Sequence, residues 1–148
     1  TTSTTPYADL RRMLVQIYFI DQNNQAGDGI PTLKRVELSE TGTMTTVALV
    51  EGIEFMQVDY GLDTTADGVA DSYTTCSACT IADWHNVVSV KITLLARNLE
   101  TSAGYTDTKT YTLGLAGNHA PASADHYKRH AYTQTIRLVN PSSRRETP

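Results

Sequence analysis

The chain has 148 residues, of which 40% are hydrophobic and only 19% are charged, and its formal net charge is −4. A single domain of this length can bury a core without staples. The net negative charge argues against a nucleic-acid-binding domain, and no apolar run in the sequence approaches the roughly 20 residues that span a membrane. The composition includes 23 Thr and 9 Ser. Threonine is β-branched and suits the solvent-facing side of a pleated strand, so the composition predicts a β-rich domain.

Alternating apolar and polar residues predict strands in the first half of the chain. The first strand is expected over residues 12–20, and the turn-forming residues 21–29 predict a hairpin loop to a second strand over 32–39. A third strand is expected over 45–49. Between residues 49 and 60 the apolar positions fit both helical and strand spacing. A short helical turn that runs into a strand would account for both patterns.

The clearest predicted strand covers residues 87–97, and we expect it to be the most buried because its apolar face is the longest. That face is formed by Val88, Val90, Ile92, Leu94 and Ala96. Further strands are expected over 105–113 and over 129–140, the last with Tyr132, Ile136 and Leu138 directed inward. The sequence thus predicts six or seven antiparallel strands in one domain, residues 12–140. A linker or frayed segment, residues 1–11, precedes it, and a polar tail, residues 141–148, follows.

The two cysteines, Cys76 and Cys79, form a C-x-x-C pair that permits three interpretations. A thioredoxin-like redox site needs a helix N-terminus within a βαβ unit, and the sequence shows no such unit. A zinc site needs two further ligands at suitable spacing. We favour a structural disulfide, which implies an oxidising compartment.

An acidic loop follows the spacing of a calcium-binding loop. Carboxylates recur at Asp63, Asp67 and Asp71, Thr65 adds a hydroxyl, and the Val69 carbonyl adds a fifth oxygen. The position that normally carries a bidentate Glu is a threonine here. The sequence therefore leaves two interpretations open: a weak Ca²⁺ site, or a turn closed by its own hydrogen bonds.

Charge is distributed unevenly along the chain. Residues 51–86 hold seven acidic residues and no Lys or Arg, whereas bases gather from Lys128 onward. Either both segments are solvated faces, or opposite charges meet within the fold or between subunits. The candidates for subunit contacts are Glu51, Glu54, Lys128 and Arg129. No nucleophile motif, phosphate loop or zinc-protease motif is present, so we expect no catalytic residues and no enzyme activity.

Several segments, in this order, resemble PilW-type minor pilins of type IV pili. They are Tyr-Phe-Ile at 18–20, Pro-Thr-Leu-Lys-Arg at 31–35, Leu-Val-Glu-Gly-Ile-Glu-Phe-Met-Gln-Val-Asp-Tyr-Gly at 49–61, Asp-Trp at 83–84, the strand at 87–97, and Tyr-Lys-Arg-His at 127–130. J-type pseudopilins of type II secretion share a weaker version of the stretch at 49–61. The Cys76–Cys79 pair is not a general feature of the family.

The resemblance implies an α+β, mostly antiparallel β, pilin-like globular domain that lacks the family's N-terminal helix here. It implies a structural subunit that takes part in the initiation of pilus assembly and in the tip complex. Its partners would be other minor pilins, the major pilin and a PilY-type tip adhesin, and it would meet the membrane only through the N-terminal helix. The protein would be exported, held at the inner membrane and periplasm, and then built into the pilus. The alternatives are a type II secretion pseudopilin or a secreted calcium-binding β-sandwich that binds a ligand.

Overall fold

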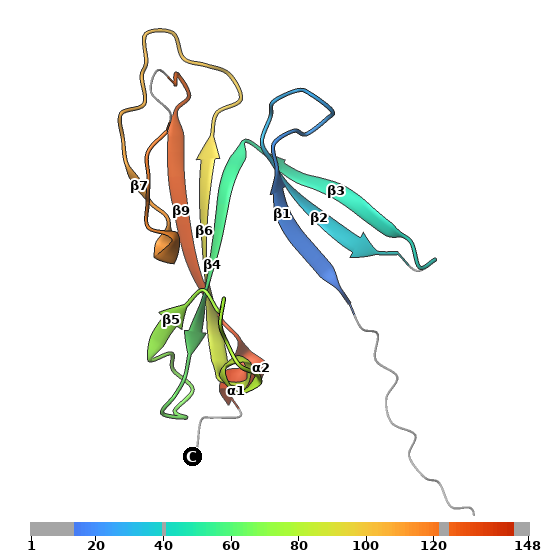
Figure 1. Ribbon diagram of the computed structural model, residues 1–148, viewed down its shortest axis with the longest axis vertical. Helices are drawn as coiled ribbons and strands as arrows, with labels where there is room; N and C mark the ends of the chain where they lie inside the picture. The colour runs from blue at the N-terminus through green and yellow to red at the C-terminus, as the bar shows by residue number, and fades with distance from the viewer. Residues whose placement is uncertain (1–13, 40, 122–124, 144–148) are drawn as a thin grey trace, which may run out of the picture.

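The computed structural model describes residues 14–39, 41–121 and 125–143. Its described part is built from two antiparallel sheets and a short two-stranded ribbon, with little helix (Figure 1). The predicted class, α+β with mostly antiparallel strands, is confirmed. Residues 1–11, the predicted linker, lie outside the described residues.

The first sheet has three strands in the order β1-β2-β3. They are β1 (Gln16–Asp21), β2 (Thr32–Leu38) and β3 (Met44–Glu51). The loop between β1 and β2 is held by Asp28, whose carboxylate accepts hydrogen bonds from the backbone amides of Asn24, Gln25 and Ile30. This is the local bonding by which Asp closes turns, and it agrees with the predicted hairpin.

The second sheet has the strand order β5-β4-β6-β9 and runs the length of the molecule (Figure 1). Its strands are β4 (Ile53–Leu62), β5 (Ser72–Thr74), β6 (Val87–Arg97) and β9 (Arg129–Arg137). Strand β6 lies between β4 and β9 and carries more buried residues than any other strand, as the sequence predicts. The second sheet therefore forms the frame on which the rest of the domain packs.

One face of this sheet is covered by the long connection from β6 to β9. The connection contains β7 (Tyr111–Thr112), the 3₁₀ turn η1 (Gly114–Ala116) and β8 (Asn118–His119). Tyr111 and Leu113 pack on Leu95 of β6, with Phe55 and Ala131 against this cluster. The buried core thus lies between the connection and this face, which we call the covered face.

The two sheets are joined at Gly52, between β3 and β4. Its amide donates to the Pro31 carbonyl at 2.7 Å, and its own carbonyl accepts from the Arg97 amide at 2.7 Å. Its φ is +78°, and a Cβ placed there would lie 2.5 Å from the Arg97 carbonyl oxygen. Only glycine fits a position that needs both a left-handed backbone and this close approach. The Gly52 joint therefore fixes how the two sheets meet.

Two short helices complete the described part of the chain. Helix α1 (Ile81–His85) begins with a capping box, in which Thr80 and Asp83 each accept a hydrogen bond from the other's backbone amide. Helix α2 (Val139–Ser143) follows β9 directly. The predicted polar tail thus begins within α2 at residues 141–143, and residues 144–148 lie outside the described chain.

The structure corrects four details of the predicted elements. Residues 49–60 form no helical turn: β3 continues to Glu51, and β4 starts directly after Gly52. The strand predicted over 105–113 is reduced to the two residues of β7. Strand β9 ends at Arg137, and two of its residues that we expected inside, Tyr132 and Ile136, are 58% and 45% exposed.

The fourth correction concerns the two faces of β6. We expected the face that carries Ile92 and Leu94 to be the buried one, but both are only half-buried. Thr93 and Leu95, on the other face, are 1% and 0% exposed. The reason is that the connection between β6 and β9 packs on the face with Leu95 and leaves the more apolar face open.

Candidate functional site

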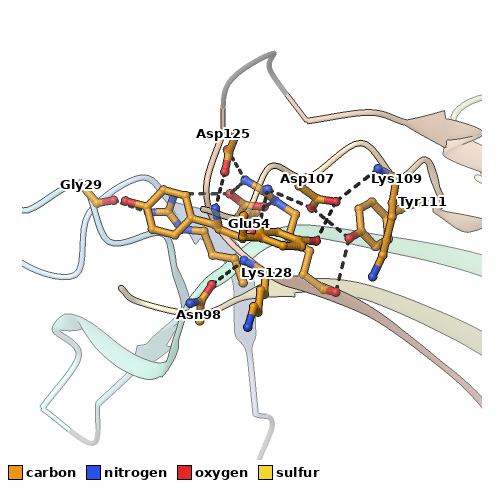
Figure 2. Close-up of polar contacts among 12 residues, drawn as sticks. Gly29, Glu54, Asn98, Asp107, Lys109, Tyr111, Asp125 and Lys128 are labelled. Carbon is orange, nitrogen blue, oxygen red and sulfur yellow. Dashed lines mark hydrogen bonds and ion pairs between the residues drawn. The ribbon is translucent and has the colours of Figure 1, made fainter. Parts of the chain in front are cut away.

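A buried guanidinium occupies the centre of a polar cluster at one end of the second sheet (Figure 2). Arg129, the first residue of β9, has a side chain that is only 3% exposed. It donates to both carboxylate oxygens of Glu54, with Nε–Oε2 at 2.5 Å and Nη2–Oε1 at 3.0 Å. It also donates to Oδ2 of Asp107 at 3.2 Å and to Oδ2 of Asp125 at 2.5 Å. We call these four residues the Arg129 cluster.

A β-bulge on β4 brings Glu54 into this cluster. In the register with β6, Ile53 pairs with Ala96 and Phe55 pairs with Leu95, so Glu54 is the extra residue. A bulge re-aims a side chain in this way. Phe55 packs on the core of the covered face, and Glu54 reaches Arg129 on the same side of the sheet.

Hydrogen bonds hold Asp107 ionised in spite of its burial. The residue is 5% exposed, and its carboxylate accepts from the hydroxyls of Tyr111 at 3.0 Å and Tyr105 at 3.2 Å. Burial acts to raise the pKa of Asp107, but the bonds from Tyr111, the Lys109 amide and Arg129 outweigh it, so this pKa lies below its ordinary value. Burial and the bond to Asp107 together raise the pKa of Tyr111 to about 12. Asp107 therefore contributes a negative charge to the cluster, and this charge is stabilised by hydrogen bonds from neighbouring residues.

The same charges shift the ionisation of Asp125 and Arg129. The hydrogen bond from Arg129 is the largest cause that lowers the pKa of Asp125. Burial acts to lower the pKa of Arg129, but its bonds to Glu54 and Asp125 raise it above its ordinary value. Both groups therefore stay charged across the physiological range.

Arg97, at the end of β6, connects the cluster to the first sheet. Its guanidinium lies 3.5 Å from Glu54 Oε1 and 3.9 Å from the centre of the Tyr127 ring. It also donates to the carbonyl oxygen of Gly29, in the loop between β1 and β2, at 2.8 Å. The two arginines thus tie together β4, β6, β9, the long connection and the first hairpin. Figure 2 shows Glu54, Asp107 and Asp125, three of the groups that accept these bonds, gathered in one region. Such an arrangement stabilises the fold and supplies no exposed reactive group.

The four predicted subunit-contact residues fall into two pairs. Glu54 and Arg129 bind each other, so their charges are engaged within the domain, and the Arg129 side chain offers little surface to a partner. Glu51 and Lys128 are exposed. Glu51 accepts a hydrogen bond from the Asn24 side chain at 2.6 Å. Glu51 and Lys128 remain predicted contact residues.

The acidic loop is closed by hydrogen bonds to its own carboxylates. Asp63 is 0% exposed and accepts from the amides of Ala66 at 2.6 Å and Gly68 at 2.9 Å. Asp71 accepts from the amide and the hydroxyl of Thr64, and these bonds lower its pKa, the hydroxyl having the largest effect.

Asp67 accepts from the Val69 amide at 2.8 Å, and the Thr65 hydroxyl lies 3.3 Å from Asp71 Oδ1. Within the described ranges, no group of three or more His, Cys, Asp or Glu side chains is placed to hold a metal ion. The bonding in this loop is that of the turn interpretation, and the Ca²⁺ site stays the alternative hypothesis.

Cys76 and Cys79 form a disulfide, as predicted, and it closes the loop between β5 and α1. Just beyond it, Trp84 of α1 packs edge-on against Tyr60 of β4, with ring centres 4.8 Å apart. Trp84 is still 46% exposed. The loop and helix therefore sit at one end of the second sheet, on the side opposite the covered face.

That opposite side of the second sheet is apolar and incompletely covered, and we call it the open face. Residues that pair directly across antiparallel strands point to the same side. By this register Gln134 of β9 lies on the open face, opposite Ile92. The apolar residues of this face are Met56, Val58 and Tyr60 of β4, Val90, Ile92 and Leu94 of β6, and Tyr132 and Ile136 of β9. None of these eight residues is buried. A contiguous apolar surface of this kind marks a site of interaction.

The described structure is a β-rich domain in which the Arg129 side chain is buried among carboxylates and one face of the second sheet is apolar and incompletely covered. No helix in its described part is long and apolar enough to cross a membrane.

The family model for PilW, the type IV pilus-assembly protein W, matches residues 17–140. The chain belongs to this family, and the resemblance seen in the sequence is thereby confirmed. Neither curated proteins nor solved structures give a significant match. The protein is therefore a component of type IV pilus assembly.

Proposed function

We propose that this chain is the globular part of a minor pilin that acts in the initiation of pilus assembly and in the tip complex. The observation that carries the proposal is the open face of the second sheet. Its apolar residues lie in register on three neighbouring strands, and a large exposed apolar patch of this kind is typical of a surface that another element covers. An apolar helix N-terminal to this domain, as in the minor pilins that the sequence resembles, is the occupant that we propose.

This proposal makes the domain a structural subunit and not an enzyme. Its partners are other minor pilins, the major pilin and a PilY-type tip adhesin, which it reaches after export, first at the inner membrane and then in the pilus. The ion pairs of Glu54 with Arg97 and Arg129 support such a role. They connect strands inside the domain and make it rigid, so the outer surfaces can contact other subunits.

The test is complementation of a strain from which the gene has been deleted, using the full-length precursor. We expect the deletion to reduce the number of surface pili and the wild-type gene to restore it. Ile92→Glu, on the open face, should fail to restore pili. Thr135→Glu is the matched control, because Thr135 is exposed on the other side of the sheet, opposite Lys91.

Circular dichroism of the purified variants separates loss of fold from loss of assembly. A folded Ile92→Glu domain that does not restore pili supports the proposal. Normal pili in the deletion strain would overturn the proposed role in assembly. Full restoration by Ile92→Glu would overturn the role of the open face while leaving the assembly role intact.

A further inference from the structure

The disulfide between Cys76 and Cys79 lies where a thiol can reach it. Both cysteines are only half-buried, and the two residues between them, Ser77 and Ala78, are exposed. Thiol–disulfide exchange begins when a thiolate attacks one of the two sulfurs, so its rate depends on access from solvent. Exposed disulfides are typically the labile and regulatory ones, whereas structural disulfides resist reduction. The position of this bond therefore leaves it open to exchange in the folded protein.

The bond has a mainly local effect on the chain. It joins residues only three positions apart, and closing so short a loop removes little entropy from the unfolded chain. The four-residue ring holds Cys76 at a φ of +56°, a left-handed conformation that residues other than glycine rarely adopt. Backbone strain of this kind is concentrated at functional sites and switch regions. Opening the ring would allow Cys76 to leave this conformation.

The helix that follows the bond is weakly held. Cys79 directly precedes Thr80, the N-cap of α1, whose hydroxyl accepts from the Asp83 amide at 3.3 Å. Helix α1 has five residues, none of them buried, and a helix this short does not form on its own. It contacts the second sheet through Trp84, which packs edge-on against Tyr60. The disulfide thus fixes the backbone at the point where α1 begins.

The pair is suited to be a target of exchange and not a catalyst of it. Every strand pair in the described chain is antiparallel, whereas a thioredoxin-like redox site is built on the parallel strands of a βαβ unit. A reductant must therefore come from outside the domain.

We propose that Cys76 and Cys79 form a reversible redox switch, and that reduction of their disulfide by a dithiol releases α1 from the second sheet. One thiolate of the dithiol attacks a sulfur of the disulfide and forms a mixed disulfide, and the other cysteine leaves as a thiolate and takes up a proton. The second thiol of the dithiol then closes on the first and releases the remaining cysteine. The dithiol is oxidised to a disulfide, and the two cysteines gain two electrons and two protons. Exchange with an oxidised disulfide reverses the reaction.

Release of α1 changes the surface at one end of the open face. Tyr60 belongs to that face, and Trp84 packs on it. Figure 1 shows α1 at the lower end of the second sheet, next to the start of β6. The Arg129 cluster lies at the other end of β6, beside Arg97, and should stay intact. Reduction should therefore expose more apolar surface at the α1 end alone. This inference does not rest on the proposed role in pilus assembly.

The first test measures exchange in the folded domain. The purified protein is incubated without denaturant at a series of ratios of reduced to oxidised dithiothreitol, and its free thiols are counted by alkylation and mass spectrometry. We expect the count to rise from none to two per chain, and to return to none when oxidised glutathione replaces the reductant. A disulfide that dithiothreitol reduces only after the protein has been denatured would overturn the proposal.

The second test follows α1. Trp84 is the only tryptophan of the chain, so the tryptophan emission reports its contact with Tyr60. Reduction should shift the emission to longer wavelength, because the indole becomes more exposed. The amides of residues 81–85 should exchange their hydrogens at least about tenfold faster. The amides of Thr93 and Leu95, buried in the middle of β6, are the internal control and should exchange at an unchanged rate.

Two results of the second test would contradict the proposal. If emission and exchange at residues 81–85 do not change, the bond does not hold α1. If exchange also accelerates at Thr93 and Leu95, the bond stabilises the whole domain and is no local switch. The double variant Cys76→Ser and Cys79→Ser is the matched control. It should behave like the reduced protein and should not respond to dithiothreitol, and a variant that matches the oxidised protein would rule out the switch.

Discussion

Glu54 on β4 and Arg129 on β9 lie on strands that do not pair with each other, yet two hydrogen bonds join their side chains across the intervening β6. The bulge on β4 and the position of Arg129 at the start of β9 make this possible. The pair links β4 to β9 at this end of the sheet. Arg129 also binds Asp107 and Asp125 and so holds the connection that covers the core.

Replacement of Arg129 should destabilise the domain strongly. In Arg129→Met, three carboxylates lose their shared cation, and removal of one partner from a buried ion pair costs about 3–5 kcal/mol of unfolding free energy. Urea unfolding followed by circular dichroism measures the change. Lys128→Met is the matched control, because Lys128 is the adjacent exposed cation. Equal stabilities of the two variants would contradict this account of the cluster.

The phenol of Tyr111 should make stability depend on pH in the alkaline range. Its pKa is raised from 10.0 to about 12 in the folded protein. A group with a raised folded pKa contributes stability that is complete below its unfolded pKa and is lost as the pH rises through the folded value. The stability difference between wild type and Tyr111→Phe should therefore shrink between pH 10 and about 12. A stability difference between wild type and Tyr111→Phe that stays constant over this range would refute the prediction.

The acidic loop should keep its stability without calcium. Because the carboxylates of Asp63 and Asp71 already accept hydrogen bonds from the loop, we expect the same melting temperature in millimolar calcium and in EDTA. A rise with calcium that Asp67→Ala abolishes would instead establish the calcium site. Asp63→Ala should cost about 1–3 kcal/mol, because buried amides lose their acceptor. Asp67→Ala, which removes one exposed bond, should cost less.

The disulfide should contribute modestly to stability. Closing a loop this short lowers the conformational entropy of the unfolded chain. On the chain-entropy estimate this raises the free energy of unfolding by about 2 kcal/mol. The double variant Cys76→Ser and Cys79→Ser should lose about that much unfolding free energy and still fold. Thiol titration of the denatured, unreduced protein should find no free thiol, and two reactive thiols would contradict the pairing.

The alternation of apolar and polar residues was sufficient to predict most strands. It was not sufficient to predict which face of each strand is buried. Strand β6 has Ile92 and Leu94 on one side and Thr93 and Leu95 on the other, so a local pattern favours the wrong face as the interior. The outcome depends on Tyr111 and Leu113, which reach Leu95 from a connection whose path no local pattern fixes.

Sites made of neighbouring residues were predicted from the sequence, and sites made of distant residues were not. The acidic loop and the cysteine pair each lie within a few residues, and their spacing predicted them. The capping box of α1 is local too, since Thr80 and Asp83 are three residues apart, but no helix was predicted there. The pairing of Glu54 with Arg129 was not predicted, since it depends on a bulge and on strand order.

The separation of Glu54 and Arg129 along the chain, 75 residues, has a consequence for how the domain folds. Contacts between distant residues form slowly, because a long loop must be closed before any bond compensates the lost entropy. Strands β4 and β6 can pair while β9 is still free. At that stage Glu54 has Arg97 of β6 as a partner but lacks Arg129, and the sheet has an open edge at β6. The domain should therefore become resistant to proteases only when β9 docks. The docking of this last strand would set the time at which the newly exported chain is protected from proteolysis.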